Sequence, residues 1–194
     1  MFSIRECLCG VLVATVVGVA TYRAIAAPKA ARADKPSEVA TRGQREAKDI
    51  SYGDWQKFCF KAGGALTLCR TTITGTFPTG QMAVRIDLIE REGTPTARLQ
   101  LFVPVGMYLQ QPAKLSVDGG STFNVPYSWC LTNACIAADV APAGIIKAME
   151  SGKTLALEVV DSNLLALTTS VPLAQFASVR KGAPTKMLEQ YVDE

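Results

Sequence analysis

The sequence contains no histidine, and this absence excludes several kinds of site at once. Serine–histidine–aspartate and cysteine–histidine catalysis both need an imidazole, as do zinc-protease helices and all other imidazole-ligated metal sites. Charged residues are also scarce, at 19% of the 194 residues, and the net charge is only +3. The basic residues form no recognisable nucleic-acid motif, so nucleic acid is not an expected partner.

The N-terminal apolar run is too short for an ordinary membrane span. Residues 8–22 are uncharged, and Ala24-Ile25-Ala26 then fits an A-x-A cleavage pattern. A run of about 15 residues suits a signal peptide, whereas a spanning helix needs about 20. We therefore expect residues 1–27 to be a signal peptide, and the protein to be periplasmic or secreted. The alternative is a retained anchor, in which Arg23 reaches the interface and residues 8–27 hold the protein on the inner membrane, facing the periplasm.

The next part of the chain has the composition of a linker. Residues 28–50 are rich in alanine and charged residues, contain Pro28, Pro36 and Gly43, and show no apolar periodicity. We predict a flexible linker there. Residues 51–181 form the body, and the 48% hydrophobic content of the chain is enough for a core. Gly182 and Pro184 interrupt the last helical pattern, so residues 182–194 are predicted to be a C-terminal tail.

Alternation of apolar and polar residues indicates strands in the body. The pattern is clearest at residues 82–88, where one face is expected in the core and the other in solvent. The expected core residues are Met82, Val84, Ile86 and Leu88. The side chains expected in solvent are Arg85, Asp87 and Arg91.

Further short strands are separated by glycine and proline turns, which favours a sandwich or barrel over a βαβ fold. They are predicted at residues 52–60, 66–73, 99–103, 115–117, 154–160 and 164–171. Apolar spacing predicts one helix over residues 140–151, ended by Gly152, and a helical segment from Leu173 to Val179. The predicted fold is mainly β: an antiparallel β-sandwich, or barrel-like, with a short helix before the last two strands and a C-terminal helical segment.

The body contains four cysteines in two blocks, Cys59 with Cys69 and Cys130 with Cys135. Export would place them in an oxidising compartment, where they can form a disulfide framework. Four thiolates would also suffice for zinc, but the gaps of nine and four residues differ from the short spacings of structural zinc sites. A gap of four residues is also not the Cys-x-x-Cys of thiol oxidoreductases.

The remaining candidates for chemistry are weak. Residues 151–154 resemble the end of a phosphate-binding loop, but Lys147 stands where that motif requires glycine. A Ser–Lys dyad needs no histidine, yet nothing in the sequence brings one serine to one lysine. Three aromatic residues near the cysteines could form a ligand platform, although such residues more often pack against a disulfide in the core. These residues are Trp55, Tyr127 and Trp129.

Several short motifs, taken in order, resemble the invasion-associated locus B family of exported bacterial proteins. The motifs are Tyr52-Gly53-Asp54-Trp55 with Cys59, Val103-Pro104-Val105-Gly106, Val117-Asp118-Gly119-Gly120, Cys130-Leu131-Thr132-Asn133-Ala134-Cys135 and Ser151-Gly152-Lys153. The resemblance covers about residues 50–180. Ala134 stands where the family usually has glycine, and Gln175-Phe176 where it tends to have Gly-Phe.

The resemblance implies a secreted or periplasmic all-β domain without an established enzymatic activity, so we expect no catalytic residue, cofactor or metal. We pair Cys59 with Cys69 and Cys130 with Cys135, because each pair is close in sequence, flanks a turn and lies in its own family-like block. The expected function is protein–protein interaction with an unidentified envelope or membrane protein. The alternative is an accessory subunit of a membrane complex, anchored through residues 8–27.

Overall fold

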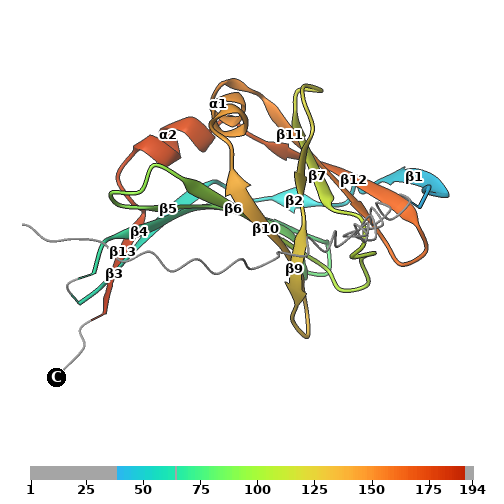
Figure 1. Ribbon diagram of the computed structural model, residues 1–194, viewed down its shortest axis with the longest axis horizontal. Helices are drawn as coiled ribbons and strands as arrows, with labels where there is room; N and C mark the ends of the chain where they lie inside the picture. Colours follow the sequence, from blue (N-terminus) through green and yellow to red (C-terminus); the bar gives the residue numbers. More distant parts are fainter. Residues whose placement is uncertain (1–38, 64, 191–194) are drawn as a thin grey trace, which may run out of the picture. The chain divides into compact units, whose positions relative to one another are not determined.

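Residues 39–63 and 65–190 are described by the structure, a computed structural model, and they form two β-sheets with short helices beside them (Figure 1). The predicted signal peptide or anchor and the first part of the predicted linker lie outside the described residues. The architecture confirms the prediction of a mainly β sandwich. Its strands are mostly antiparallel, and each sheet has one parallel edge pair.

The smaller sheet, here sheet A, has the strand order β1-β12-β11-β7-β8. Its strands are β1 (Gly43–Glu46), β7 (Ala113–Val117), β8 (Phe123–Val125), β11 (Thr154–Val160) and β12 (Leu165–Pro172). β11 and β12 form an antiparallel hairpin with Thr154 opposite Pro172. These two strands are close to the predicted ones, because their alternation is local and turn residues separate them.

The larger sheet, here sheet B, has the order β13-β3-β4-β5-β6-β10-β9, with β2 also paired to β4. Its strands are β2 (Ser51–Tyr52), β3 (Gln56–Ala62), β4 (Leu68–Thr76), β5 (Met82–Arg91), β6 (Ala97–Val103), β9 (Tyr127–Cys130), β10 (Cys135–Ala141) and β13 (Lys186–Gln190). The chain crosses from sheet A to sheet B between β8 and β9, at Pro126.

The core lies between the inward faces of the two sheets. Ile86, Leu88 and Leu99 of sheet B are fully buried, as are Leu115 and Leu155 of sheet A. Each side chain of this size contributes about 1.5–3 kcal/mol through burial. The alternation predicted for β5 therefore places Ile86 and Leu88 correctly.

Two helices follow strands at one end of the sandwich (Figure 1). They are α1 (Ala143–Ser151) and α2 (Phe176–Lys181), which overlap the two predicted helical segments, although Val140 and Ala141 of the first prediction belong to β10. Phe176 at the start of α2 packs edge-on against Trp55, with 4.9 Å between the ring centroids. The Trp55 indole also donates a hydrogen bond to the Pro172 carbonyl at 2.8 Å. These contacts hold α2 and the end of β12 against the residue that precedes β3 of sheet B.

Three sequence-based expectations need correction. Residues 43–46, in the predicted linker, form β1, and residues 186–190, in the predicted tail, form β13. Both are parallel edge strands, and pairing with a distant strand leaves no local alternation to detect. Asp87 is expected in solvent, but the residue is only 1% exposed. Arg91 is exposed as expected, whereas Arg85 is half-buried.

Candidate interaction site on a disulfide-closed hairpin

The structure joins the cysteines in the predicted pairs. Cys59 and Cys69 lie directly opposite each other on β3 and β4, and Cys130 and Cys135 lie opposite each other on β9 and β10. The S–S distances are 1.98 and 2.01 Å. These four sulfurs are therefore unavailable as zinc ligands. Within residues 39–63 and 65–190, no group of three His, Cys, Asp or Glu residues could hold a metal ion.

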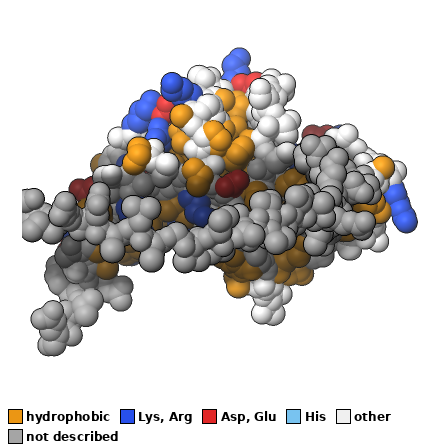
Figure 2. All heavy atoms as spheres, viewed as in Figure 1, with side chains coloured by type: hydrophobic (Ala, Val, Ile, Leu, Met, Phe, Trp, Pro, Cys, Tyr) orange, Lys and Arg blue, Asp and Glu red, His pale blue; other side chains and the backbone are white. Residues whose placement is uncertain are grey.

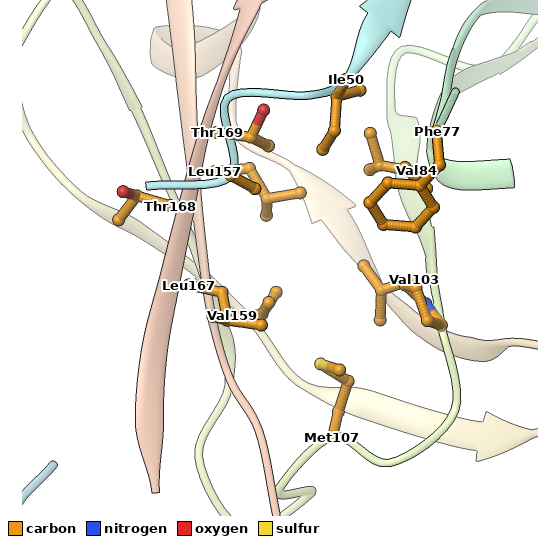
Figure 3. Close-up of a pocket in the computed structure, with 13 residues that line it drawn as sticks. Ile50, Phe77, Val84, Val103, Met107, Leu157, Val159, Leu167, Thr168 and Thr169 are labelled. Carbon is orange, nitrogen blue, oxygen red and sulfur yellow. The ribbon is translucent and has the colours of Figure 1, made fainter. Parts of the chain in front are cut away.

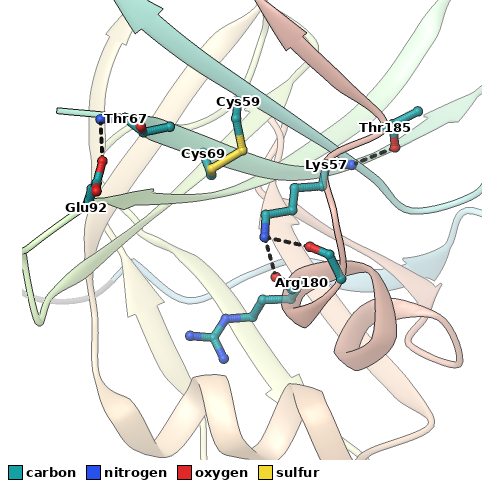
Figure 4. The surroundings of a disulfide bond; sticks show 8 residues. Lys57, Cys59, Thr67, Cys69, Glu92, Arg180 and Thr185 are labelled. Atoms are coloured by element: carbon teal, nitrogen blue, oxygen red, sulfur yellow. Dashed lines mark hydrogen bonds between the residues drawn. A yellow bond between two sulfur atoms is a disulfide. The ribbon is translucent and has the colours of Figure 1, made fainter. Parts of the chain in front are cut away.

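The Cys59–Cys69 bond lies beside a network of charges that ties the helices to sheet B (Figure 4). The Lys57 ammonium donates to the Arg180 and Gly182 carbonyls, at 2.8 and 3.0 Å, and so satisfies the C-terminal end of α2. The Arg180 guanidinium in turn donates to Glu90 and Glu150 at 2.6 Å each. Basic and acidic side chains accordingly lie side by side over the helices (Figure 2).

The ion pairs in this network lower the pKa of one of its carboxylates. The hydrogen bond from Lys181, with additional bonds from Arg180, lowers the pKa of Glu150 below its ordinary value of 4.5. Lys57, Arg180 and Lys181 thus each have an acceptor already in place. We interpret the network as a structural clamp between α1, α2 and β5.

The segment that resembles a phosphate-binding loop has its donors occupied. The Asp118 carboxylate accepts hydrogen bonds from the Lys153 and Thr154 backbone amides, each at 2.9 Å. The element before it is α1, where a phosphate-binding loop requires a strand. The arrangement joins the turn after β7 to the start of β11.

An apolar cavity of about 70 Å³ lies between the two sheets (Figure 3). Phe77, Val84 and Val103 line one side, and Leu157 and Val159 line the other. The lining contains no charged side chain, and its only hydroxyls belong to two threonines. The cavity therefore offers no acid, base or nucleophile. We interpret it as a gap in sandwich packing.

The three aromatic residues singled out in the sequence have different environments. Trp55 is 4% exposed and belongs to the core, and Tyr127 packs partly buried against that core. Trp129 is 48% exposed, so the core packing expected for it is wrong. Only this third aromatic remains available as a contact platform.

A β-bulge in β9 makes the side chains of Tyr127 and Trp129 point to opposite faces of sheet B. Trp129 pairs with Ile136 and Tyr127 with Ala137, so Ser128 is an extra residue in β9. Such a bulge re-aims side chains along a strand. Tyr127 consequently turns to the core and Trp129 to the outside.

Burial leaves the Tyr127 hydroxyl without a hydrogen-bond partner among the described residues. It also raises the pKa of Tyr127 well above its ordinary value of 10. The other partly buried tyrosine, Tyr52, is different because its hydroxyl lies 2.8 Å from the Thr169 hydroxyl and shares a hydrogen bond with it. The anchoring of Tyr127 is therefore apolar, through its ring.

The hairpin of β9 and β10, called the β9–β10 hairpin, presents apolar side chains on a rigid support. Leu131 is 51% and Val140 is 52% exposed, in addition to Trp129. The Cys130–Cys135 bond and a hydrogen bond from the Leu131 amide to the Ala134 carbonyl at 2.7 Å close the tip. Residues 119–138 carry no charge. The visible side chains at the hairpin turn, low in the view, are hydrophobic or uncharged (Figure 2).

This hairpin is the feature with the chemistry of a binding site. Exposed Trp and Leu on a fixed backbone lose little conformational entropy on binding, and tryptophan is enriched among residues that dominate interfaces. Sequence reasoning found Trp129 but not its exposure, because the bulge leaves no signature in a single sequence. The charge-free stretch was the available signal.

Comparison with known proteins places the chain in a family. The crystal structure of invasion associated protein b from Bartonella henselae superposes with a TM-score of 0.59, at 22% identity, over 67% of this chain and 90% of that chain. No curated protein matches the chain. Among the described residues, no helix has the length and apolarity to cross a membrane. The family described as Invasion associated locus B (IalB) protein matches residues 55–184, more than half of the sequence, and the chain therefore belongs to the IalB family.

Proposed function

We propose that this protein is exported and acts without catalysis, by binding another protein of the bacterial periplasm or envelope through the β9–β10 hairpin. The proposal depends on the exposed Trp129, which lies on a disulfide-closed hairpin whose residues 127–138 carry no charge. Two disulfides and membership of the IalB family favour export. The charged groups near the helices are already paired with one another, which suits a structural role.

Site-specific photo-cross-linking tests the proposal. A photoreactive benzophenone amino acid at position 129 is expected to form a discrete adduct with one envelope protein in the native bacterium. The same group at Lys147, an exposed residue of α1, is the matched control and should form no such adduct. Identical products from both positions, or none from position 129, would contradict the proposal.

A second candidate, from the apolar run at residues 8–22, is an accessory subunit held on a membrane complex. In that case the N-terminal segment stays on the chain and the body faces the periplasm. Extraction of the native membrane with high salt or alkali distinguishes the two. A body released without detergent contradicts the anchored form, and one released by detergent alone supports it.

A further inference from the structure

The outward face of sheet B combines arginine with aromatic side chains. Residues directly opposite each other in neighbouring strands share a face, which defines rows across the sheet. One row consists of Trp129, Ile136, Phe102 and Arg85. Another consists of Val140, Arg98, Ile89, Arg70 and Phe58. Between them lie Ala138, Gln100, Asp87 and Thr72.

The outward-facing positions of these strands carry five cations and one carboxylate. The cations are Arg70, Arg85, Arg91, Arg98 and Lys186. The carboxylate, Asp87, is buried beneath two of the arginines. This face therefore has an excess of positive charge, although the whole chain has a net charge of only +3. On the outward face of sheet A, by contrast, Lys114 and Glu158 pair at 3.2 Å.

Two of the arginines are held in place. The Arg85 guanidinium carbon lies 3.6 Å from the Phe102 ring centroid, and its Nε lies 3.3 Å from the Asp87 carboxylate. Arg70 lies 5.6 Å from the Phe60 ring centroid and 3.9 Å from the same carboxylate. Stacking and pairing fix these planes, so they can meet a carboxylate at little further entropic cost. Their side chains remain 29% and 31% exposed.

We propose that this face docks an acidic segment of a protein partner, with its carboxylates on Arg85, Arg70 and Arg98 and an apolar side chain against Trp129. The inference deepens the proposed function and rests on it. Arginine and aromatic residues are enriched in protein interfaces while lysine is depleted, and four of the five cations here are arginines. Because these guanidinium planes are held in fixed orientations, they favour a protein ligand with carboxylates in defined positions over an anionic membrane surface.

Selection of short random peptides on the purified, oxidised protein tests the inference. The selected peptides should be enriched in Asp and Glu next to an aromatic or aliphatic residue. Their affinity should fall at least about tenfold when the ionic strength rises from about 0.01 to about 0.15 M, because the screening length shortens from about 30 to about 8 Å.

Variants of exposed residues locate the site. Arg98→Glu and Trp129→Ala should each weaken peptide binding at least about tenfold, while Arg42→Glu, a charge reversal beside sheet A, should leave it unchanged. The double variant Arg85→Gln with Asp87→Asn removes the Arg85–Asp87 ion pair and should also weaken peptide binding at least about tenfold. Circular dichroism establishes that each variant is folded.

The outcomes separate this inference from the proposed function. Peptides without acidic enrichment, or indifferent to Arg98→Glu, overturn the acidic docking face. If such peptides still depend on Trp129, the proposed function stands. Peptides that ignore both substitutions contradict both. Failure to select any peptide, with binding to phosphatidylglycerol vesicles instead, would assign the face to a membrane and also overturn the inference.

Discussion

Asp87 lies on the outward side of β5, as alternation requires, yet its carboxylate is almost fully buried. The Thr72 hydroxyl donates a hydrogen bond to it, and Arg70 and Arg85 cover it. Alternation in sequence specifies which face a residue takes. It does not specify how long side chains on neighbouring strands then fold over that face.

The two residues next to Asp87 test the assignment of β5. Ile86→Asp should lower the free energy of unfolding by more than about 4 kcal/mol, because it buries an unpaired charge. Arg85→Ala should cost about 1–2 kcal/mol through the lost stacking and ion pair. Urea denaturation measures both. Equal losses for the two variants would show the register to be wrong.

The two partly buried tyrosines make a matched pair. Tyr127→Phe removes a buried hydroxyl that has no partner among the described residues, so stability should be unchanged or rise by about 1 kcal/mol. Tyr52→Phe removes the hydrogen bond with Thr169 and should cost about 1 kcal/mol. Thermal denaturation at neutral pH compares them. A larger loss for Tyr127→Phe would mean that its hydroxyl has a partner.

The raised pKa of Tyr127 should make the stability of the protein depend on pH in the alkaline range. Its folded pKa is above the unfolded value of about 10, so its contribution is complete below pH 10 and is lost as pH rises further. The alkaline loss of stability should therefore be smaller in Tyr127→Phe than in the wild type.

At the scale of elements, the sequence predicted those strands and helices whose signals lie within their own residues. Residues 82–88, 154–160 and the helices at 143–151 and 176–181 have patterns or stop signals within the element itself. β1 and β13 pair in parallel with strands more than a hundred residues away, and their own side chains carry no alternation. The bulge in β9 depends on the partner strand, so the exposure of Trp129 could not be predicted.

The two disulfides should differ in their contribution to stability. Their closed loops span sequence separations of 10 and 5, for which the chain-entropy relation gives about 2.7 and about 2.1 kcal/mol. The double Cys→Ser variant at 59 and 69 should therefore be less stable than that at 130 and 135. The second variant should instead lose partner binding, because it frees the tip beside Trp129. Urea denaturation and peptide binding separate these effects, and a reversed order of stability would contradict the prediction.

The clamp around Arg180 should make stability sensitive to acid. Because the pKa of Glu150 is lowered in the folded state, its contribution is complete above about pH 4.5 and is lost as pH falls through the folded value. Lys181→Met should reduce this acid loss, since Lys181 is the main cause of the shift. Lys147→Met, an exposed change on α1, is the control. Parallel pH–stability curves for all three proteins would contradict the clamp.

At the scale of the whole molecule, the outward faces of the two sheets differ in charge and in aromatic content. Sheet A carries few charges and pairs Lys114 with Glu158, whereas sheet B gathers arginines, aromatic rings and the exposed hairpin. Composition could not predict this asymmetry, since a net charge of +3 is almost neutral for 194 residues. It becomes visible only when register places distant strands side by side.

The N-terminus and the mass of the native protein test whether residues 1–27 are removed. If residues 1–27 are a signal peptide, native protein should begin near Ala27 or Pro28, and its mass should be lower than that of the reduced mature chain by two hydrogens per disulfide. Intact mass spectrometry with and without a reducing agent measures both features in one preparation. A retained N-terminus would instead support the anchored candidate. Free thiols at all four body cysteines would contradict export, because the disulfides are the part of the structure that requires an oxidising compartment.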